Sequence, residues 1–225
     1  MTVAPNDALG LDDLLALAPV IPVVVLDDPE DAVPLARALV AGGLPAIEVT
    51  LRTPAAVAAI ERIAAEVPDA VVGAGTVMSA EHVARTLAAG ARFLVSPGST
   101  PALLDAMEAS GAPFLPGAST ASEVLGLTER GIGVAKLFPA EAVGGIATLK
   151  AFAGPFAGVR FCPTGGIDRE KAVGYLALPN VACVGGSWMV PPAAIRAGEW
   201  AAIETLAREA AALRRRAAPP LRAVS

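Results

Sequence analysis

Short apolar runs recur eight times along this chain, and segments with the spacing of amphipathic helices separate them. The runs are rich in β-branched residues and too short for buried helices, so they predict strands. We expect these strands at residues 20–26, 46–51, 70–75, 92–96, 113–115, 132–138, 159–162 and 181–185. Parallel strands need long crossover connections, which the intervening helices supply. Eight such units predict an α/β fold of the closed (β/α)8 barrel (TIM barrel) type, and a doubly wound open sheet is the alternative.

Capping residues mark the ends of the expected helices. Thr53 and Thr100 precede prolines that suit a first helical turn, so we expect both to be N-caps. Four glycines are expected to end helices in the left-handed conformation, namely Gly42, Gly90, Gly111 and Gly131. The helices themselves are expected at residues 11–17, 31–41, 54–66, 80–89, 101–109, 122–130 and 200–214.

The length of 225 residues and the hydrophobic content of 54% fit one domain with a large core. No linker or change of composition divides the chain. We therefore expect residues 1–225 to form a single domain, with a leading helix and a loose tail at about 215–225. The net charge of −5 gives no general attraction to nucleic acid or to an anionic membrane.

No apolar segment with a basic leader opens the chain, and glycines and prolines interrupt the uncharged stretch at 172–195. We therefore expect neither a secretory signal nor a membrane-spanning helix. Cys162 and Cys183 fall in separate expected strands and do not make a disulfide framework. We expect both to be buried free thiols in a reducing cytoplasm.

Lys136 lies within the apolar run at 132–139, where a charged residue is not expected. An ammonium group is costly to remove from water, so burial favours the neutral amine of a lysine. The neutral amine is the form that attacks carbonyl carbons, which makes Lys136 a candidate nucleophile. The alternatives are a lysine that reaches solvent from a strand end and a lysine paired with a buried carboxylate.

Glu48, Thr50 and Arg52 alternate along the second expected strand, so their side chains face one side of the sheet. In a barrel this side is the interior, where Lys136 is also expected to point. Chemistry in barrels takes place at the carboxyl ends of the strands. Glu48 is therefore a candidate for proton transfer beside Lys136. A structural ion pair of Glu48 and Arg52 that closes the barrel end is the alternative.

Glycines follow several of the expected strands: GAGT at 73–76, SPG at 96–98, GG at 165–166 and GG at 185–186. Glycine lets a ligand approach the backbone closely. Paired glycines after the last two strands of a barrel are typical of phosphate sites, because backbone N–H groups there bind the oxygens. We expect such a site here, and tight turns without a ligand are the alternative.

The chain has one histidine and two separated cysteines, which do not make a ligand cluster for a transition metal. No group of acidic residues suggests a Mg²⁺ site. We expect no metal and no cofactor, and we expect His82 to be a surface residue on its helix.

Taken together, these residues resemble the 2-keto-3-deoxy-6-phosphogluconate (KDPG) aldolase and 4-hydroxy-2-oxoglutarate aldolase family. The resemblance runs from about residue 19 to 206, and the motifs follow the family's order. They are EVTLR at 48–52, GAGT at 73–76, KLFPAE at 136–141, AGPF at 153–156, RFCPTGGI at 160–167 and GGSW at 185–188. The family comprises class I aldolases on a (β/α)8 barrel, usually homotrimers. They cleave KDPG to pyruvate and glyceraldehyde 3-phosphate in the Entner–Doudoroff pathway.

The resemblance also implies roles for the matched residues. Lys136 would form the Schiff base, and Glu48 would be the general acid and base. The other matched residues would bind a small phosphorylated keto-acid: Arg52 and Thr76 at its pyruvyl part, Pro97 and Phe138 along the pocket, and Thr164, Gly165, Gly166, Gly186 and Ser187 around its phosphate.

Two alternatives remain open beside KDPG cleavage. The same pyruvyl chemistry serves aldolases for 4-hydroxy-2-oxoglutarate and for the epimer 2-dehydro-3-deoxy-6-phosphogalactonate. An isomerase or synthase on a phosphate-binding barrel, without imine chemistry, is the alternative from another class.

Overall fold

A computed structural model of the protein describes residues 10–213, so the tail expected at 215–225 lies outside the described residues. The strands are β1 (Val20–Val24), β2 (Ala46–Thr50), β3 (Val71–Gly75), β4 (Leu94–Val95), β5 (Phe114–Leu115), β6 (Gly117–Ala118), β7 (Val134–Leu137), β8 (Arg160–Phe161) and β9 (Val184–Gly186). They coincide with the eight apolar runs, except that the fifth run is followed by the separate strand β6.

The helices alternate with these strands. They are α1 (Leu11–Ala16), α2 (Ala32–Ala41), α3 (Ala56–Glu66), α4 (Ala80–Ala88), α5 (Pro101–Ser110), α6 (Ala121–Glu129), α7 (Gly145–Phe152), α8 (Arg169–Leu176), α9 (Pro192–Arg196) and α10 (Trp200–Ala211). Short 3-10 helices, Pro29–Asp31 and Glu141–Val143, precede α2 and α7. Helices α7, α8 and α9 are not among the ranges expected from sequence. They are short, so their apolar periodicity gives only a weak signal.

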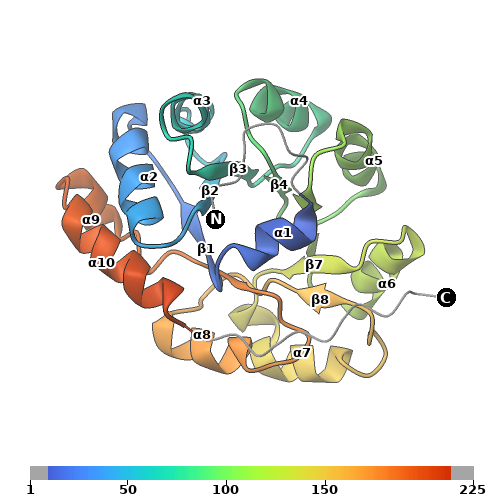
Figure 1. Cartoon of the computed structure of the whole chain (residues 1–225). Helices are drawn as coiled ribbons and strands as arrows, with labels where there is room; N and C mark the ends of the chain where they lie inside the picture. The colour runs from blue at the N-terminus through green and yellow to red at the C-terminus, as the bar shows by residue number, and fades with distance from the viewer. Residues whose placement is uncertain (1–9, 214–225) are drawn as a thin grey trace.

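The molecule is an α/β fold built on parallel strands. One sheet has the order β5-β4-β3-β2-β1-β9, and a second has the order β6-β7-β8. Every ladder between these strands is parallel. Isolated bridges join Phe161 to Val181 and Thr164 to Gly185, between the β8 region and the β9 region. Figure 1 shows the helices arranged around the strands.

The strands bury two different faces. Ile47 and Val49 belong to a core cluster that also contains buried residues of the helices, so this layer lies between strands and helices. The alternate side chains, such as Ala46 and Val71, form a second cluster. This is the period of two that the sequence predicts for a strand buried on both faces.

Helix α1 lies over the amino-terminal ends of the strands. Leu14 and Leu15 are almost fully buried, and they share the second cluster with Ile21, Ala46 and Val71, which lie early in β1, β2 and β3. In Figure 1, α1 lies in front of the strands. The view in Figure 1 is therefore from the amino-terminal side, and the carboxyl ends of the strands open on the far side. Among residues 10–213, no helix is long and apolar enough to cross a membrane.

Only one of the two expected threonine caps is present. Thr100 Oγ1 accepts a hydrogen bond from Leu103 N at 3.3 Å and caps α5. Thr53 does not cap α3, because its hydroxyl instead donates to the carbonyl of Leu26. The Thr53 prediction is wrong because the Thr53 hydroxyl bonds to the segment at Leu26 and not to the first turn of α3.

Three of the four helix-ending glycines are left-handed: Gly90, Gly111 and Gly131 have φ of 93°, 68° and 76°. Gly42 has φ −77°, and the left-handed residue is Gly43 with φ 89°. A Cβ on Gly42 would lie 2.4 Å from the Cβ of Ala207. Gly42 is therefore needed for the close approach of α2 and α10, not for its backbone conformation.

Candidate active site

Glu48 and Lys136 form a buried ion pair between two strands that are far apart in the sequence. Glu48 lies on β2 and Lys136 on β7, and each side chain is only 3% exposed. Lys136 Nζ donates a hydrogen bond to Glu48 Oε1 at 3.1 Å. The ammonium does not reach solvent from a strand end, so that alternative for Lys136 is wrong. Both a structural pair and a proton-transfer pair fit this geometry.

Glycine makes room for the Glu48 carboxylate. Gly75 is the register partner of Thr50 on the neighbouring strand β3. A Cβ on Gly75 would lie 2.2 Å from Glu48 Oε1. Any side chain at position 75 would therefore displace the carboxylate that contacts Lys136. The GAGT motif fits this packing as well as a ligand approach.

Phe138 lies next to Lys136, and Pro97 lies next to the strand that pairs with it. Lys136 Nζ lies 5.3 Å from the centroid of the Phe138 ring, within the range of a cation–π contact. Gly117 is the register partner of Lys136 on β6, and a Cβ on Gly117 would lie 2.3 Å from the carbonyl carbon of Pro97. The Phe138 ring thus adjoins Lys136, the backbone of Pro97 adjoins the neighbouring strand β6, and both residues are half-buried.

Arg52 and Thr76 contact each other. Arg52 Nε donates to Thr76 Oγ1 at 3.3 Å, and the Arg52 side chain is exposed. Thr76 follows Gly75 and has φ 59°, a left-handed conformation that β-branched residues rarely adopt. Such strain is concentrated at functional sites. Thr50, which lies between Glu48 and Arg52 on the same face of the sheet, is buried. Its hydroxyl donates to the Val24 carbonyl, so it links β2 to β1.

The glycine pairs of the expected phosphate site lie next to each other. Thr164 and Gly185 form an isolated bridge, and a Cβ on Gly185 would lie 2.2 Å from Thr164 Oγ1. A Cβ on Gly165 would lie 3.4 Å from the Phe138 ring, so this turn also adjoins the Lys136 strand. Gly186 is buried at the end of β9, and Ser187 is exposed.

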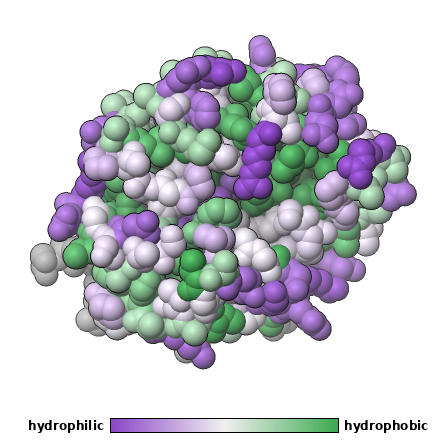
Figure 2. Space-filling model, turned by 180° about the vertical axis from the view of Figure 1, so that it is seen from behind, coloured by the Kyte–Doolittle hydropathy of each residue, from purple (hydrophilic) through white to green (hydrophobic). Residues whose placement is uncertain are grey.

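These residues belong to the carboxyl ends of the strands, opposite α1. Figure 2 shows this far side of the molecule, where hydrophobic residues come to the surface near the middle and hydrophilic residues gather around them. A separate pocket between α3 and α4 is lined by Leu51, Thr53, Pro54, Val57, His82, Arg85 and Thr86. His82 is half-buried there, and its Nδ1 accepts from Met78 N at 3.3 Å. His82 thus lies on its helix as expected, partly exposed at the mouth of this pocket.

A polar cluster behind the Gly165–Gly166 turn was not expected from sequence. Glu141 Oε2 lies 2.9 Å from Lys171 Nζ, and Glu141 Oε1 accepts from the Tyr175 hydroxyl. The hydrogen bonds from Tyr175 and then Lys171 hold the pKa of Glu141 below its ordinary value. Glu141 in turn raises the pKa of Lys171, and burial followed by Glu141 raises the pKa of Tyr175. The only sequence signal was the position of Glu141 at the end of the KLFPAE motif.

A buried lysine in contact with a carboxylate, at the carboxyl ends of parallel strands, is the arrangement of an enzyme that acts on carbonyl compounds. Comparison with known proteins narrows this class. The family model for KDPG and KHG aldolase matches residues 11–206. The chain therefore belongs to the KDPG and KHG aldolase family.

Relatives and solved structures agree with this family. The KHG/KDPG aldolase of Escherichia coli K12 is 52% identical over 205 residues, covering 91% of this chain and 96% of the relative. The KDPG aldolase of Legionella pneumophila, solved with pyruvate captured as a covalent carbinolamine, is 48% identical with a TM-score of 0.88 and coverage of 90% and 98%. That of Zymomonas mobilis ZM4 with 3-phosphoglycerate is 47% identical, with a TM-score of 0.88 and coverage of 95% and 100%.

Proposed function

We propose that this protein is a class I aldolase that cleaves 2-dehydro-3-deoxy-6-phosphogluconate to pyruvate and D-glyceraldehyde 3-phosphate. The observation that carries the proposal is the buried contact of 3.1 Å between Lys136 Nζ and Glu48 Oε1. It places an amine nucleophile and a proton acceptor together in a chain of the KDPG and KHG aldolase family. Class I aldolase chemistry needs both groups.

We further propose that the strands form one closed (β/α)8 barrel in a single domain. The bridges at Phe161 and Thr164 support a junction between the two sheets on one side. On the other side, only Pro116 separates β5 from β6, and its carbonyl accepts from Lys136 N at 2.7 Å. These contacts support a continuous ring of strands that holds β2 and β7 in place on opposite arcs.

In the proposed mechanism, the neutral amine of Lys136 attacks the keto carbon, and loss of water gives a protonated imine. The bond between the α carbon and the hydroxyl-bearing β carbon then breaks, and its electron pair moves toward the protonated imine and forms an enamine. Glu48 accepts the proton of the substrate hydroxyl as glyceraldehyde 3-phosphate leaves. The enamine takes up a proton, and water hydrolyses the imine to pyruvate and free Lys136.

The two ends of the substrate are assigned to different parts of the site. Arg52 and Thr76 would hold the pyruvyl carboxylate, and their contact of 3.3 Å supports a shared role. Pro97 and Phe138 would line the pocket. The phosphate would lie against Thr164, Gly165, Gly166, Gly186 and Ser187, whose arrangement around the Thr164–Gly185 bridge supports one anion site.

The same arrangement supports 4-hydroxy-2-oxoglutarate as a second substrate, because the relative from Escherichia coli is named for both activities. It also keeps the phosphogalactonate epimer as a candidate. We propose a homotrimer that works in the cytoplasm without a cofactor. The two buried cysteines, Cys162 and Cys183, are compatible with a reducing compartment.

Borohydride reduction in the presence of pyruvate tests the mechanism. We expect irreversible labelling of Lys136 alone, because a reduced imine cannot hydrolyse. Peptide mapping by mass spectrometry locates the label. The control variants Lys136→Arg and Lys150→Arg should lose and keep the label, respectively, since a guanidinium is not a neutral amine nucleophile. Labelling at Lys150 or Lys171 would refute the assignment of the imine to Lys136. No labelling at all would refute the imine and favour an isomerase or synthase.

A further inference from the structure

The Gly165–Gly166 turn has three consecutive carbonyl groups that accept hydrogen bonds. Ala140 N donates to the Thr164 carbonyl at 2.8 Å, and Glu141 N donates to the Gly165 carbonyl at 3.2 Å. The Gly166 carbonyl accepts from the side chain of Lys171 at 3.0 Å. Within residues 10–213, the amide of Gly166 donates no hydrogen bond, whereas the Thr164–Gly185 bridge directs the Gly165 amide toward the Gly185 carbonyl. The carbonyls are therefore held by the protein, and the Gly166 N–H group is available to an anion.

A turn of two glycines does not hold itself in this form. Gly165 and Gly166 have φ of 107° and 77°, and glycine samples such angles freely along with many others. The backbone of Ala140 and Glu141 fixes the first part of the turn. Lys171 is the group that fixes the Gly166 end, and it does so through a flexible side chain.

Neighbouring groups fix the Lys171 side chain. Asp168 caps α8 by accepting from Lys171 N at 2.9 Å, which sets the first turn of that helix. Glu141 pairs with the Lys171 ammonium and also accepts from Tyr175, whose side chain is fully buried. The Glu141 stem lies against Gly166, where a Cβ would be only 2.9 Å from Glu141 Cβ and Cγ.

Gly145 leaves space for the hydrogen bond between Tyr175 and Glu141. A Cβ on Gly145 would lie 2.5 Å from the Tyr175 hydroxyl and 3.0 Å from Glu141 Oε1. Glu141, Lys171 and Tyr175 thus form a connected chain from the core to the turn, here named the turn clamp. A half-exposed ion pair such as Glu141–Lys171 adds little to stability. Its geometry points instead to orientation of the turn.

We propose that the turn clamp consists of positioning residues that orient the Gly166 end of the Gly165–Gly166 turn, with its free amide, toward the substrate phosphate and so set the preference for phosphorylated keto-acids. The inference rests on the proposed function, because it takes the phosphate to bind at this turn. Glu141 is an acidic residue beside an anion site, yet in this proposal it favours anion binding because it orients the turn.

The sign of the Glu141→Gln effect separates orientation from charge. If Glu141 acted by charge alone, removing its carboxylate would strengthen phosphate binding, because a repulsive neighbour is lost. A glutamine cannot bind Lys171 and Tyr175 as the carboxylate does, so the clamp predicts weaker binding. We expect KM for 2-dehydro-3-deoxy-6-phosphogluconate and Ki for inorganic phosphate to rise about 3- to 10-fold, the effect of one lost hydrogen bond.

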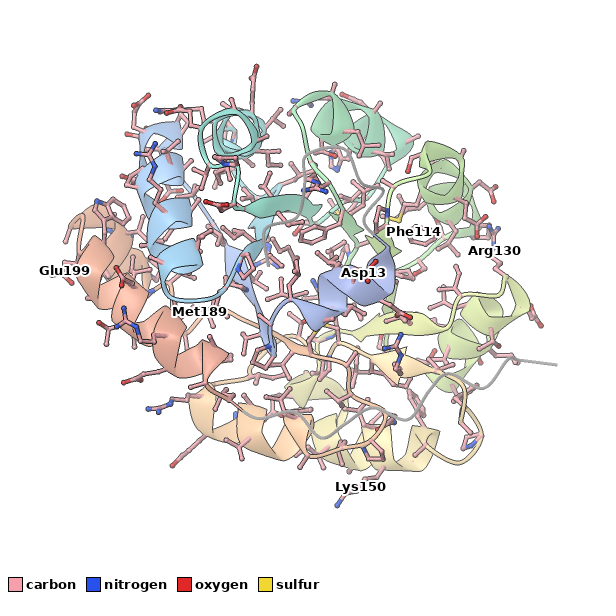
Figure 3. All side chains as sticks on the ribbon, viewed as in Figure 1. Asp13, Phe114, Arg130, Lys150, Met189 and Glu199 are labelled. Atoms are coloured by element: carbon pink, nitrogen blue, oxygen red, sulfur yellow. The ribbon has the colours of Figure 1, made fainter. Side chains whose placement is uncertain are left out.

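Lys171→Met is the second variant, and Lys150→Met is its matched control. Lys150 is exposed and projects from α7 away from the molecule (Figure 3). We expect Lys171→Met to raise KM for 2-dehydro-3-deoxy-6-phosphogluconate and Ki for inorganic phosphate about 3- to 10-fold. We expect little change in kcat, or in kcat/KM for 4-hydroxy-2-oxoglutarate. Lys150→Met should change neither constant. Circular dichroism confirms that each variant is folded.

Three results would overturn the inference. The first is tighter phosphate binding by Glu141→Gln. The second is a Lys171→Met variant whose KM and Ki equal those of Lys150→Met. The third is an equal loss of kcat/KM on phosphorylated and unphosphorylated substrates, which would indicate a structural role. Ser187→Ala distinguishes a failure of the turn clamp from a failure of the phosphate-site assignment. If it weakens only the phosphorylated substrate while the clamp variants do not, the clamp alone is wrong. If it affects both substrates equally, the phosphate assignment fails and the clamp with it.

Discussion

At the scale of single residues, Lys136 and Glu48 occupy positions that stability does not explain. Both are almost fully buried, and a buried ion pair is often no more stable than hydrophobic residues of the same size. Apolar residues adjoin Lys136 along β7, so an apolar replacement would suit the strand. A costly pair in an otherwise apolar core is typical of a functional site.

Glu48→Gln tests the role of the carboxylate. We expect the imine between pyruvate and Lys136 to form, while kcat falls about 10²- to 10⁴-fold, the usual contribution of a general acid or base. Borohydride trapping measures the imine, and coupled detection of pyruvate measures turnover. Normal turnover in this variant would assign proton transfer to another group. Because an unpaired buried charge destabilises a protein, the unfolding free energy should be measured alongside.

At the scale of elements, the start of α6 is a capping box. Thr120 Oγ1 accepts from Glu123 N at 3.3 Å, and Glu123 Oε2 accepts from Ser119 N and Thr120 N at 2.7 and 2.8 Å. The hydrogen bonds from these amides, led by that of Ser119, lower the pKa of Glu123 below 4.5. The ionised carboxylate is therefore favoured by folding.

This lowered pKa gives a pH-dependent prediction. The stabilisation by Glu123 is present above the unfolded value of 4.5 and is lost as the pH falls through the lower folded value. We expect Glu123→Gln to reduce the unfolding free energy by about 0.5–1 kcal/mol at pH 7 and by less at acidic pH. Urea denaturation at several pH values measures this. The exposed Glu129→Gln on the same helix is the control, and an equal effect there would rule out the cap.

At the scale of the whole molecule, α1 covers the amino-terminal end of the strands, so that only the far end is left for chemistry. Leu14 is 1% exposed within the cluster formed by the early strand residues. Because nothing else on α1 except Leu15 is buried, the helix is attached mainly through these two leucines.

Leu14→Ala should therefore weaken the entire fold. We expect a loss of about 2–5 kcal/mol in the unfolding free energy, the usual effect of deleting a buried leucine. The same substitution at Leu125, which is 52% exposed on α6, is the control and should cost much less. Equal losses for the two variants, measured by urea denaturation, would mean that α1 does not seal the strands.

Local patterns were sufficient for the strands and for most helices, but not for α7, α8 and α9. The period of two in β2 places Ile47 and Val49 against the helices, as the core cluster confirms. The cap at Thr100 and the left-handed Gly111 were also predictable, because capping needs only neighbouring residues. The family was predictable for a related reason, since its motifs are short runs with a fixed order.

Contacts between distant segments were decided only by the tertiary structure. Gly42 looked like a helix end but serves the approach of α10, and Thr53 looked like a cap but contacts Leu26. The turn clamp joins Glu141 to residues on α8 that the sequence does not relate to it.

The sequence by itself indicated which residues are candidates for unusual chemistry, because a lysine in an apolar run and paired glycines after strands conflict with ordinary packing. It also led us to expect Glu48 near Lys136, but it did not determine the direct contact between these side chains, which lie 88 positions apart in the chain. That contact depends on the register of the parallel strands and on the space at Gly75. Strand register is fixed by the burial of both sheet faces at once, and this is a property of the folded chain rather than of any local run of residues.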